Sequence, residues 1–114
     1  MAADDEHIIQ REIVRAVRAD GFLVFAIPNG GRRNVVTATR LKAEGVMAGA
    51  PDLFVADYGG FFLEVKTETG KLSAAQDEMA QALFERNFMT FTVRSVAEAQ
   101  AAVRAMKRRN RIRG

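Results

Sequence analysis

Two stretches, Gly49-Ala50-Pro51-Asp52 and Phe61-Phe62-Leu63-Glu64-Val65-Lys66, stand on either side of the turn Tyr58-Gly59-Gly60. Short apolar runs around a glycine-containing turn predict a β-hairpin formed by residues 53–57 and 61–66. Two carboxylates and a lysine lie at the open end of this hairpin. Because hard divalent cations take carboxylate ligands and leave positions for phosphate oxygens, this set suits a divalent metal and a phosphodiester.

The register of the hairpin decides whether these three side chains share a face of the sheet. A three-residue turn predicts the opposed pairs Asp57–Phe61, Phe54–Glu64 and Asp52–Lys66. In that register Asp52, Glu64 and Lys66 lie on one face. A two-residue turn at Gly59-Gly60 would turn Glu64 and Lys66 away from Asp52. The alternative is that Glu64 and Lys66 have no catalytic role and are alternating polar residues on an exposed face of the sheet.

Periodicity elsewhere predicts helices around this hairpin. Ile9, Ile13 and Val17 recur at helical spacing within residues 5–19, with arginines on the opposite side. The other expected elements are a strand at 22–27, a short helix at 37–44, a helix after Ser73, a strand at 89–93 and a helix from Ser95 to about Lys107. This order predicts an α/β fold in which helices pack on a mixed sheet of about four strands.

Two capping boxes mark the starts of the last two helices. Ser73 is followed three residues later by Gln76, and Ser95 is followed three residues later by Glu98. Apolar residues at helical spacing after Gln76 predict the buried stripe of the first of these helices, and they are Met79, Ala80, Leu83 and Phe84.

Two helices each direct a polar side chain inward near the N-terminal end. Glu6 precedes the apolar stripe of the first helix at helical spacing, and Gln76 precedes the stripe of the later helix in the same way. Gln76 is also explained as the capping partner of Ser73, and Glu6 as an acidic first-turn residue that complements the helix dipole. If both converge on Asp52 and Glu64, the polar residues form one constellation.

The composition is that of an ordinary globular protein. A length of 114 residues with 48% hydrophobic residues predicts one domain, spanning 1–114. There is no cysteine, which excludes disulfides and thiolate metal sites. Without a signal-peptide pattern at the N-terminus, we expect an intracellular, cytoplasmic protein of a bacterial or phage-type setting.

The net charge of +3 is a weak indication of a nucleic-acid partner, and its distribution says more. Basic residues crowd the chain from Lys107 onward, which predicts a basic C-terminal tail that is either a frayed, solvated end or a contact to DNA. Asn29, Arg32 and Arg33 belong to a glycine-rich loop suited to phosphate contacts, although a plain solvent loop explains the same residues. His7, the single histidine, is expected on the surface.

Several motifs together point to a family. They are Glu6 with Gln10, Gly49-Ala50-Pro51-Asp52, Glu64-Val65-Lys66, Gly70-Lys71-Leu72-Ser73 and Gln76. This set resembles the VRR-NUC domain, a branch of the PD-(D/E)xK nuclease superfamily, from about Glu6 to Arg94. Ala74-Ala75 depart from the Pro-Glu that often precedes this glutamine. The resemblance implies a restriction-endonuclease-like αβββαβ core.

The resemblance also implies a metal-dependent hydrolase. Phosphodiester hydrolysis would need Mg²⁺ or Mn²⁺, with Asp52 and Glu64 as direct ligands and the Val65 carbonyl as a third. Glu6 would hold the metal through water. These roles make the chain a deoxyribonuclease that cuts within the strand.

The remaining roles concern the water and the substrate. Lys66 would assist the attacking water or the transition state, Gln76 would steady Lys66 or the water network, and Lys71 would join the 29–33 loop in binding nucleic acid. Short standalone members resemble homodimeric resolvases of four-way (Holliday) junctions, so branched DNA and a second copy are the expected partners. One small domain has one site, whereas two symmetric cuts need two sites related by symmetry. The alternatives are a non-catalytic nucleic-acid-binding module and a structural protein with a surface salt-bridge cluster.

Overall fold

The computed structural model describes residues 2–28 and 35–113, with side chains described for 5–28 and 36–112. Its elements are α1 (Ala2–Ala19), β1 (Val24–Ala26), α2 (Val35–Ala43), β2 (Leu53–Val55), β3 (Phe61–Val65), α3 (Ala74–Phe84), β4 (Thr90–Val93) and α4 (Val96–Arg113). The predicted α/β class and the order of its elements are confirmed. None of the described helices is both long enough and apolar enough to cross a membrane.

The four strands form one sheet in the order β1-β2-β3-β4. β1, β2 and β3 pair antiparallel, whereas β3 and β4 pair parallel with α3 as their crossover. β1 is an edge strand of three residues, shorter than the predicted run 22–27, because β2 offers it only three pairing positions. Leu23 and Phe25 are accordingly exposed by 61% and 46%.

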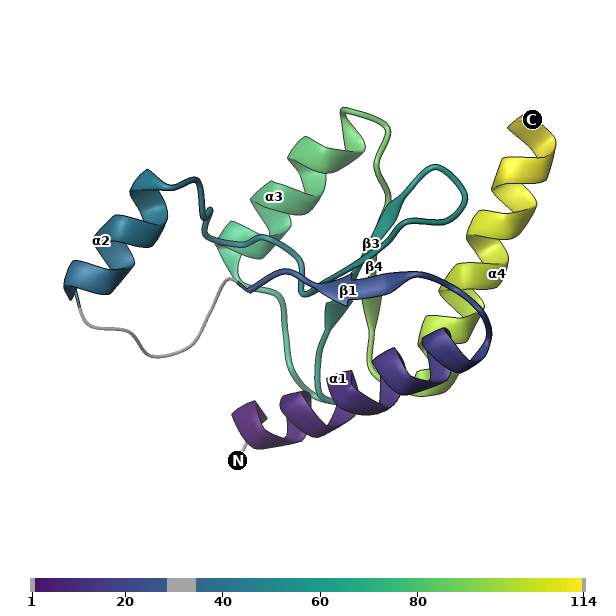
Figure 1. The fold of residues 1–114 in the computed structure, drawn as a ribbon, viewed down its shortest axis with the longest axis horizontal. Helices are drawn as coiled ribbons and strands as arrows, with labels where there is room; N and C mark the ends of the chain where they lie inside the picture. Colours follow the sequence, from purple (N-terminus) through teal and green to yellow (C-terminus); the bar gives the residue numbers. More distant parts are fainter. Residues whose placement is uncertain (1, 29–34, 114) are drawn as a thin grey trace.

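The core lies on one face of the sheet, beneath α1 and α4 (Figure 1). Ile13 and Val17, which the helical spacing predicted as inward-facing, are buried. Alternate strand residues meet them, because side chains of a strand point to opposite faces. The core also contains Val24, Leu53, Val55, Phe61, Leu63, Val65, Val93, Ala99, Ala102, Val103 and Met106.

The opposite face of the sheet carries Phe54, Phe62 and Glu64, and α3 packs there. The predicted buried stripe of α3 is wrong for Phe84, which is 59% exposed, and α3 has no fully buried residue. The reason is that α2 stands away from the sheet (Figure 1) and leaves α3 to cover this face. A hollow of about 400 Å³ remains on this face, and Phe62, Met79 and Leu83 are among its lining residues.

Two details of α4 differ from expectation. The helix continues to Arg113 instead of ending near Lys107, since no glycine or proline intervenes before Gly114 and basic residues suit a helix C-terminus. The predicted basic tail is thus the end of α4. The second capping box is incomplete: the Ser95 hydroxyl accepts from the Glu98 N–H at 3.2 Å, but the Glu98 carboxylate accepts from the Arg94 N–H at 2.8 Å.

Candidate active site

The hairpin register differs from the prediction by two residues. Val55 opposes Phe61 and Leu53 opposes Leu63, so five residues, 56–60, connect the strands. Asp57 causes this change because its carboxylate accepts from the Leu23 N–H at 2.9 Å and leaves the strand. The predicted pairs Asp57–Phe61, Phe54–Glu64 and Asp52–Lys66 are wrong. A shift of two residues keeps every side chain on its predicted face.

The observed register brings the two carboxylates closer together than the predicted one. Continued by one residue from the Leu53–Leu63 pair, it places Asp52 opposite Glu64. The Ile27 N–H donates to the Asp52 carbonyl at 2.8 Å, so the backbone of Asp52 points to β1 and the Asp52–Glu64 position is a non-hydrogen-bonded pair with β3. Opposed residues at such positions lie about 4.5 Å apart at Cα, the closest approach in an antiparallel sheet.

Glu64 is a buried acid with only 3% of its surface exposed. Burial raises the pKa of its carboxyl to about 9, with further contributions from a hydrogen bond to Asp52 and from the charge of Asp52. Lys66 lowers this pKa in part. Without a cation, the Asp52–Glu64 pair therefore holds a proton at neutral pH, and a bound cation would have to displace it.

Lys66 and Glu6 complete the charged group from two different elements. Lys66 directly follows β3 and is 9% exposed, with its aliphatic stem beside Gly70. Glu6 reaches the site from the first turns of α1. Partial burial raises its pKa, the charge of Lys66 lowers it and the charge of Asp52 raises it, which places all three groups within electrostatic range.

Gln76 contributes to the site and to its helix cap at once. Its side-chain amide donates to Glu64 Oε2 at 3.0 Å, while its Oε1 accepts from the Ser73 N–H at 2.8 Å. The predicted capping box is confirmed, because the Ser73 hydroxyl also accepts from the Gln76 N–H at 3.1 Å. The described contact of Gln76 is with Glu64, whereas the prediction placed it by Lys66 or the site's water.

Pro51 changes the hydrogen bonding at the end of the hairpin. Because the backbone of Asp52 points to β1, the neighbouring position 51 points to β3, where the register opposes it to Val65. A proline has no N–H to give the Val65 carbonyl. The Val65 N–H in turn donates to Asp52 Oδ2 at 2.7 Å. This arrangement orients the Asp52 carboxylate and leaves the Val65 carbonyl without its usual ladder donor.

Arg94, which the sequence did not single out, organises the turn that follows Lys66. Its guanidinium donates to the carbonyls of Thr67 and Gly70, both at 2.6 Å, and to that of Glu68 at 3.3 Å. The turn leads directly to Ser73 and the start of α3. Arg94 therefore links the end of β4 to the segment that connects Lys66 with Gln76. A lone arginine after a strand carries no sequence signal for this role.

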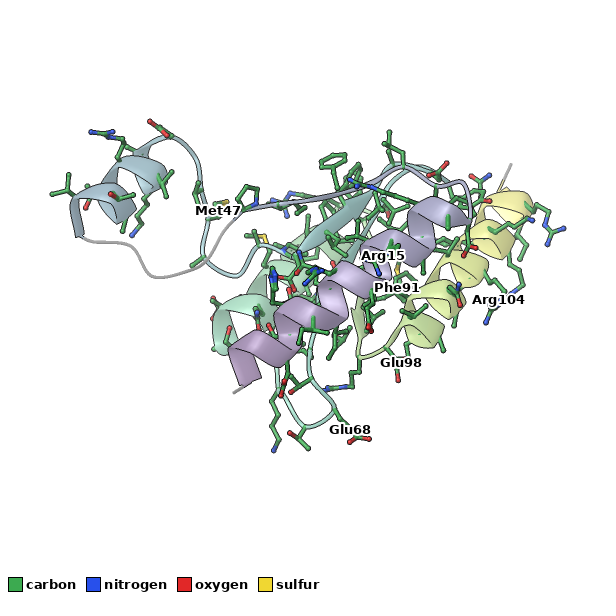
Figure 2. All side chains as sticks on the ribbon, turned by 60° about the horizontal axis from the view of Figure 1, so that its bottom comes forward. Arg15, Met47, Glu68, Phe91, Glu98 and Arg104 are labelled. Carbon is green, nitrogen blue, oxygen red and sulfur yellow. The ribbon has the colours of Figure 1, made fainter. Side chains whose placement is uncertain are left out.

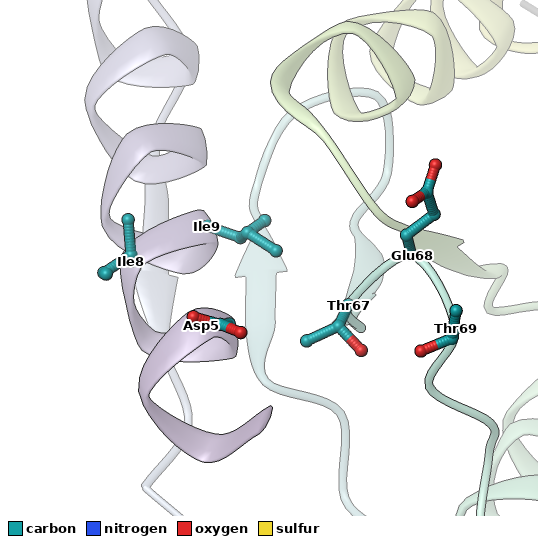
Figure 3. A pocket seen from close by; sticks show the side chains of 6 residues that line it. All are labelled: Asp5, Ile8, Ile9, Thr67, Glu68 and Thr69. Atoms are coloured by element: carbon teal, nitrogen blue, oxygen red, sulfur yellow. The ribbon is translucent and has the colours of Figure 1, made fainter. Parts of the chain in front are cut away.

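Of the other predicted site residues, Lys71 is exposed beyond the turn and does not join this cluster. Asn29, Arg32 and Arg33 lie outside the described residues. A hollow of about 610 Å³ lies between α1 and the turn and is lined by Asp5, Ile8, Ile9, Thr67, Glu68 and Thr69 (Figure 3). Among residues with described side chains, no three His, Cys, Asp or Glu form a metal-binding group.

The fold of this chain is similar to that of two solved structures. No family model and no curated protein sequence matches the chain. A solved structure described as "VRR_NUC domain protein" superposes with a TM-score of 0.71 at 19% identity, covering 87% of this chain and 84% of that one. A second, described as "VRR_NUC domain", gives a TM-score of 0.61 at 24% identity, covering 88% and 95%.

The chain has the VRR-NUC fold. The predicted αβββαβ core is confirmed, with α2 inserted between the first two strands. At identities of 19% and 24%, these comparisons establish the architecture alone. In this VRR-NUC fold, Asp52, Glu64 and Lys66 occupy the open end of the central hairpin, and the starts of α1 and α3 bring Glu6 and Gln76 to them.

Proposed function

We propose that this protein is a metal-dependent nuclease that hydrolyses phosphodiester bonds within DNA. The observation that carries the proposal is the buried Glu64 with Lys66 buried beside it and the partly buried Asp52 opposite. Burying a carboxylate and a lysine costs free energy unless they are paired or bind an ion. A surface salt-bridge cluster would not need a Glu64 that is almost wholly buried.

The donor set fits Mg²⁺ or Mn²⁺. Asp52 and Glu64 would be direct ligands, and the Val65 carbonyl is available because Pro51 offers it no ladder hydrogen bond. Glu6 is near enough to act through a water molecule. When bound, the cation polarises the phosphodiester and lowers the pKa of the attacking water.

The remaining groups orient the ligands and the substrate. Gln76 holds one oxygen of Glu64, so the other oxygen stays directed at Asp52 and the metal position. Lys66 places a positive charge where the oxygens of the reacting phosphate gain negative charge. Arg94 fixes the turn after Lys66 and limits the positions that the lysine can take.

We propose branched DNA, in particular the four-way junction, as the substrate and a homodimer as the active form. The support is the VRR-NUC fold together with the single carboxylate site per chain. Symmetric cutting of a junction needs two such sites related by a two-fold axis. DNA is thus the expected partner, with a second copy of the chain supplying the second cut.

Incubation with a labelled four-way junction or a matched linear duplex, with Mg²⁺ or Mn²⁺, tests this proposal. Asp52→Ala should lower the cleavage rate at least about 100-fold, since the metal contributes several kcal/mol to transition-state stabilisation. Asp52→Asn, which keeps an acceptor for the Val65 N–H, guards against misfolding, and the exposed Asp77→Ala is the matched control. Equal products from wild type and both Asp52 variants would refute the assignment.

The same preparations decide the finer points. Preference for the junction over the duplex, and a dimer in sedimentation equilibrium, support the proposed substrate and assembly. DNA binding that survives chelation, with no product in any metal, would instead identify a non-catalytic nucleic-acid-binding module. A monomer that cuts both strands symmetrically would contradict the homodimer.

Pro51→Ala should weaken metal binding without touching a carboxylate. Alanine supplies an N–H opposite the Val65 carbonyl, and the metal then competes with a hydrogen bond worth about 1 kcal/mol, a three- to tenfold loss of affinity. Calorimetric titration with Mn²⁺ measures the loss, and amide exchange detects the new protected N–H at position 51. Pro28→Ala, at the other proline of the chain, is the control. A protected amide at position 51 with unchanged affinity would remove Val65 from the ligand set.

A further inference from the structure

One flank of α1 carries a row of basic side chains. His7, Arg11, Arg15 and Arg18 recur at intervals of four, four and three residues, so they lie along one side of the helix, and all are exposed. Figure 2 shows the side chains of α1 with Arg15 labelled. A groove of about 450 Å³, which we call the basic groove, is lined by His7, Gln10, Arg11, Val14, Arg15 and Arg18.

The two flanks of α1 differ in charge. The hollow on the side of the Thr67–Thr69 turn is lined by two acidic residues, Asp5 from α1 and Glu68 from the turn (Figure 3). Among the residues with described side chains, none that lines the basic groove is acidic. An anionic chain that approaches the site is therefore repelled on one side of α1 and attracted on the other.

Hydrogen bonds to backbone carbonyls connect α1 to β1, and β1 to Asp52 in the site. The Arg18 guanidinium donates to the Val24 carbonyl at 3.1 and 3.3 Å, which holds this flank of α1 against β1. The N–H of Ile27, just after β1, donates to the Asp52 carbonyl. At the other end of α1, Glu6 lies within electrostatic range of Asp52 and Lys66. One end of the groove, at Arg18, is thus held against β1, and α1 leads from there to Glu6 near Asp52 and Lys66.

Arg11 and Arg15 are available for a ligand. Within the described part of the chain, no hydrogen bond or ion pair ties either guanidinium to another residue. At 1.5 Å per residue they lie about 7 and 13 Å along the helix axis from Glu6. With a rise of about 3.4 Å per nucleotide, these distances correspond to roughly two and four nucleotides of one DNA strand.

We propose that the basic groove of α1 binds the phosphate backbone of the DNA strand that enters the Asp52–Glu64 site. This inference rests on the proposed nuclease function and adds the path of its substrate. Arg11 and Arg15 contact phosphates about two nucleotides apart through guanidinium hydrogen bonds, which suit phosphate geometry. Arg18 holds the groove against β1. The contacts are to the backbone and do not depend on base sequence.

Fluorescence anisotropy with a labelled DNA duplex, in chelator, tests the groove separately from cleavage. Arg11→Glu/Arg15→Glu should weaken binding at moderate salt about tenfold or more, and reduce the slope of log affinity against log salt by about two. Arg86→Glu/Arg104→Glu, at exposed positions after α3 and on α4, changes the net charge equally and is the control. Arg11→Gln/Arg15→Gln repeats the test without introducing acids, and circular dichroism checks the helix.

The outcomes separate this inference from the proposed function. Unchanged affinity and slope in the Arg11/Arg15 variants, with cleavage still dependent on Asp52, would overturn the groove alone. Equal losses in the charge-matched control would show that only net charge matters and would overturn the groove too, as would the absence of duplex binding in wild type. Tighter binding of an RNA duplex with the same loss would assign the groove to RNA. If the wild type cuts no DNA but the Arg11/Arg15 variants still lose binding, the groove is supported and the nuclease function is refuted.

Discussion

Gly49→Ala should destabilise the protein by about 2–5 kcal/mol, the largest stability effect expected of a single methyl group here. Gly49 has a φ of +84°, where an alanine costs about 1–2 kcal/mol. An added Cβ would also collide with the backbone carbonyl of Ala75, in the first turn of α3. Because backbone cannot rotate away as a side chain does, α3 would have to move and would carry Gln76 away from Glu64.

Gly59→Ala provides a closely matched control for this effect. Its φ is +83°, but no atom lies within 4 Å of the added Cβ. The difference between the two variants in urea unfolding therefore isolates the contact with α3 from the cost of the backbone conformation. Equal destabilisation would show that α3 does not depend on close approach at Gly49. A normal fold in Gly49→Ala with weakened metal binding would locate the damage at Gln76.

Glu64→Gln should abolish metal binding and remove a pH dependence of stability. In the metal-free protein the Glu64 pKa is raised to about 9, against an ordinary value of 4.5. Between these values the folded state holds a proton that the unfolded state has released, so wild-type stability falls as pH rises. This contribution is fully present below about pH 4.5 and is lost as pH passes through about 9. Glutamine does not titrate, so the variant should be the more stable one in chelator at pH 8.

The affinity for metal should also depend on pH through Glu64, but it should rise with pH, whereas the folding stability falls. The cation must displace the proton of Glu64, so its apparent affinity should rise about tenfold per pH unit below pH 9 when one proton is released. Thermal unfolding across this pH range, with and without Mg²⁺ or Mn²⁺, measures both effects. Glu68→Gln, on the exposed turn, is the control. A metal-dependent rise in Tm that persists in Glu64→Gln would exclude Glu64 as a ligand.

The candidate site was predictable wherever a pattern within one element sufficed. The helical spacing of Glu6 with Ile13 and Val17 correctly placed Glu6 on the inward side of α1. The capping box of Ser73 and Gln76 located the start of α3, and strand alternation put Asp52 and Glu64 on one face. Each of these inferences uses the repeat of a helix or a strand, which depends only on neighbours along the chain.

Predictions failed where residues distant in sequence decide the outcome. The hairpin register depends on Asp57, whose carboxylate leaves the strand to bind the N–H of Leu23. The exposure of Phe84 depends on α2, which does not cover α3. The function of Arg94 depends on the carbonyls of a turn more than twenty positions away. None of these partners is visible in the local pattern.

By itself, the sequence determined which chemical groups the site contains and on which side of each helix or strand they lie. It placed a proline, which has no N–H, before Asp52, and a glycine where α3 must approach closely. Only the tertiary structure decided that Asp52 opposes Glu64, that Glu64 is buried with a raised pKa, and that Gln76 reaches it. The physical reason is that periodicity acts along one element, whereas register, burial and pKa arise from contacts between elements.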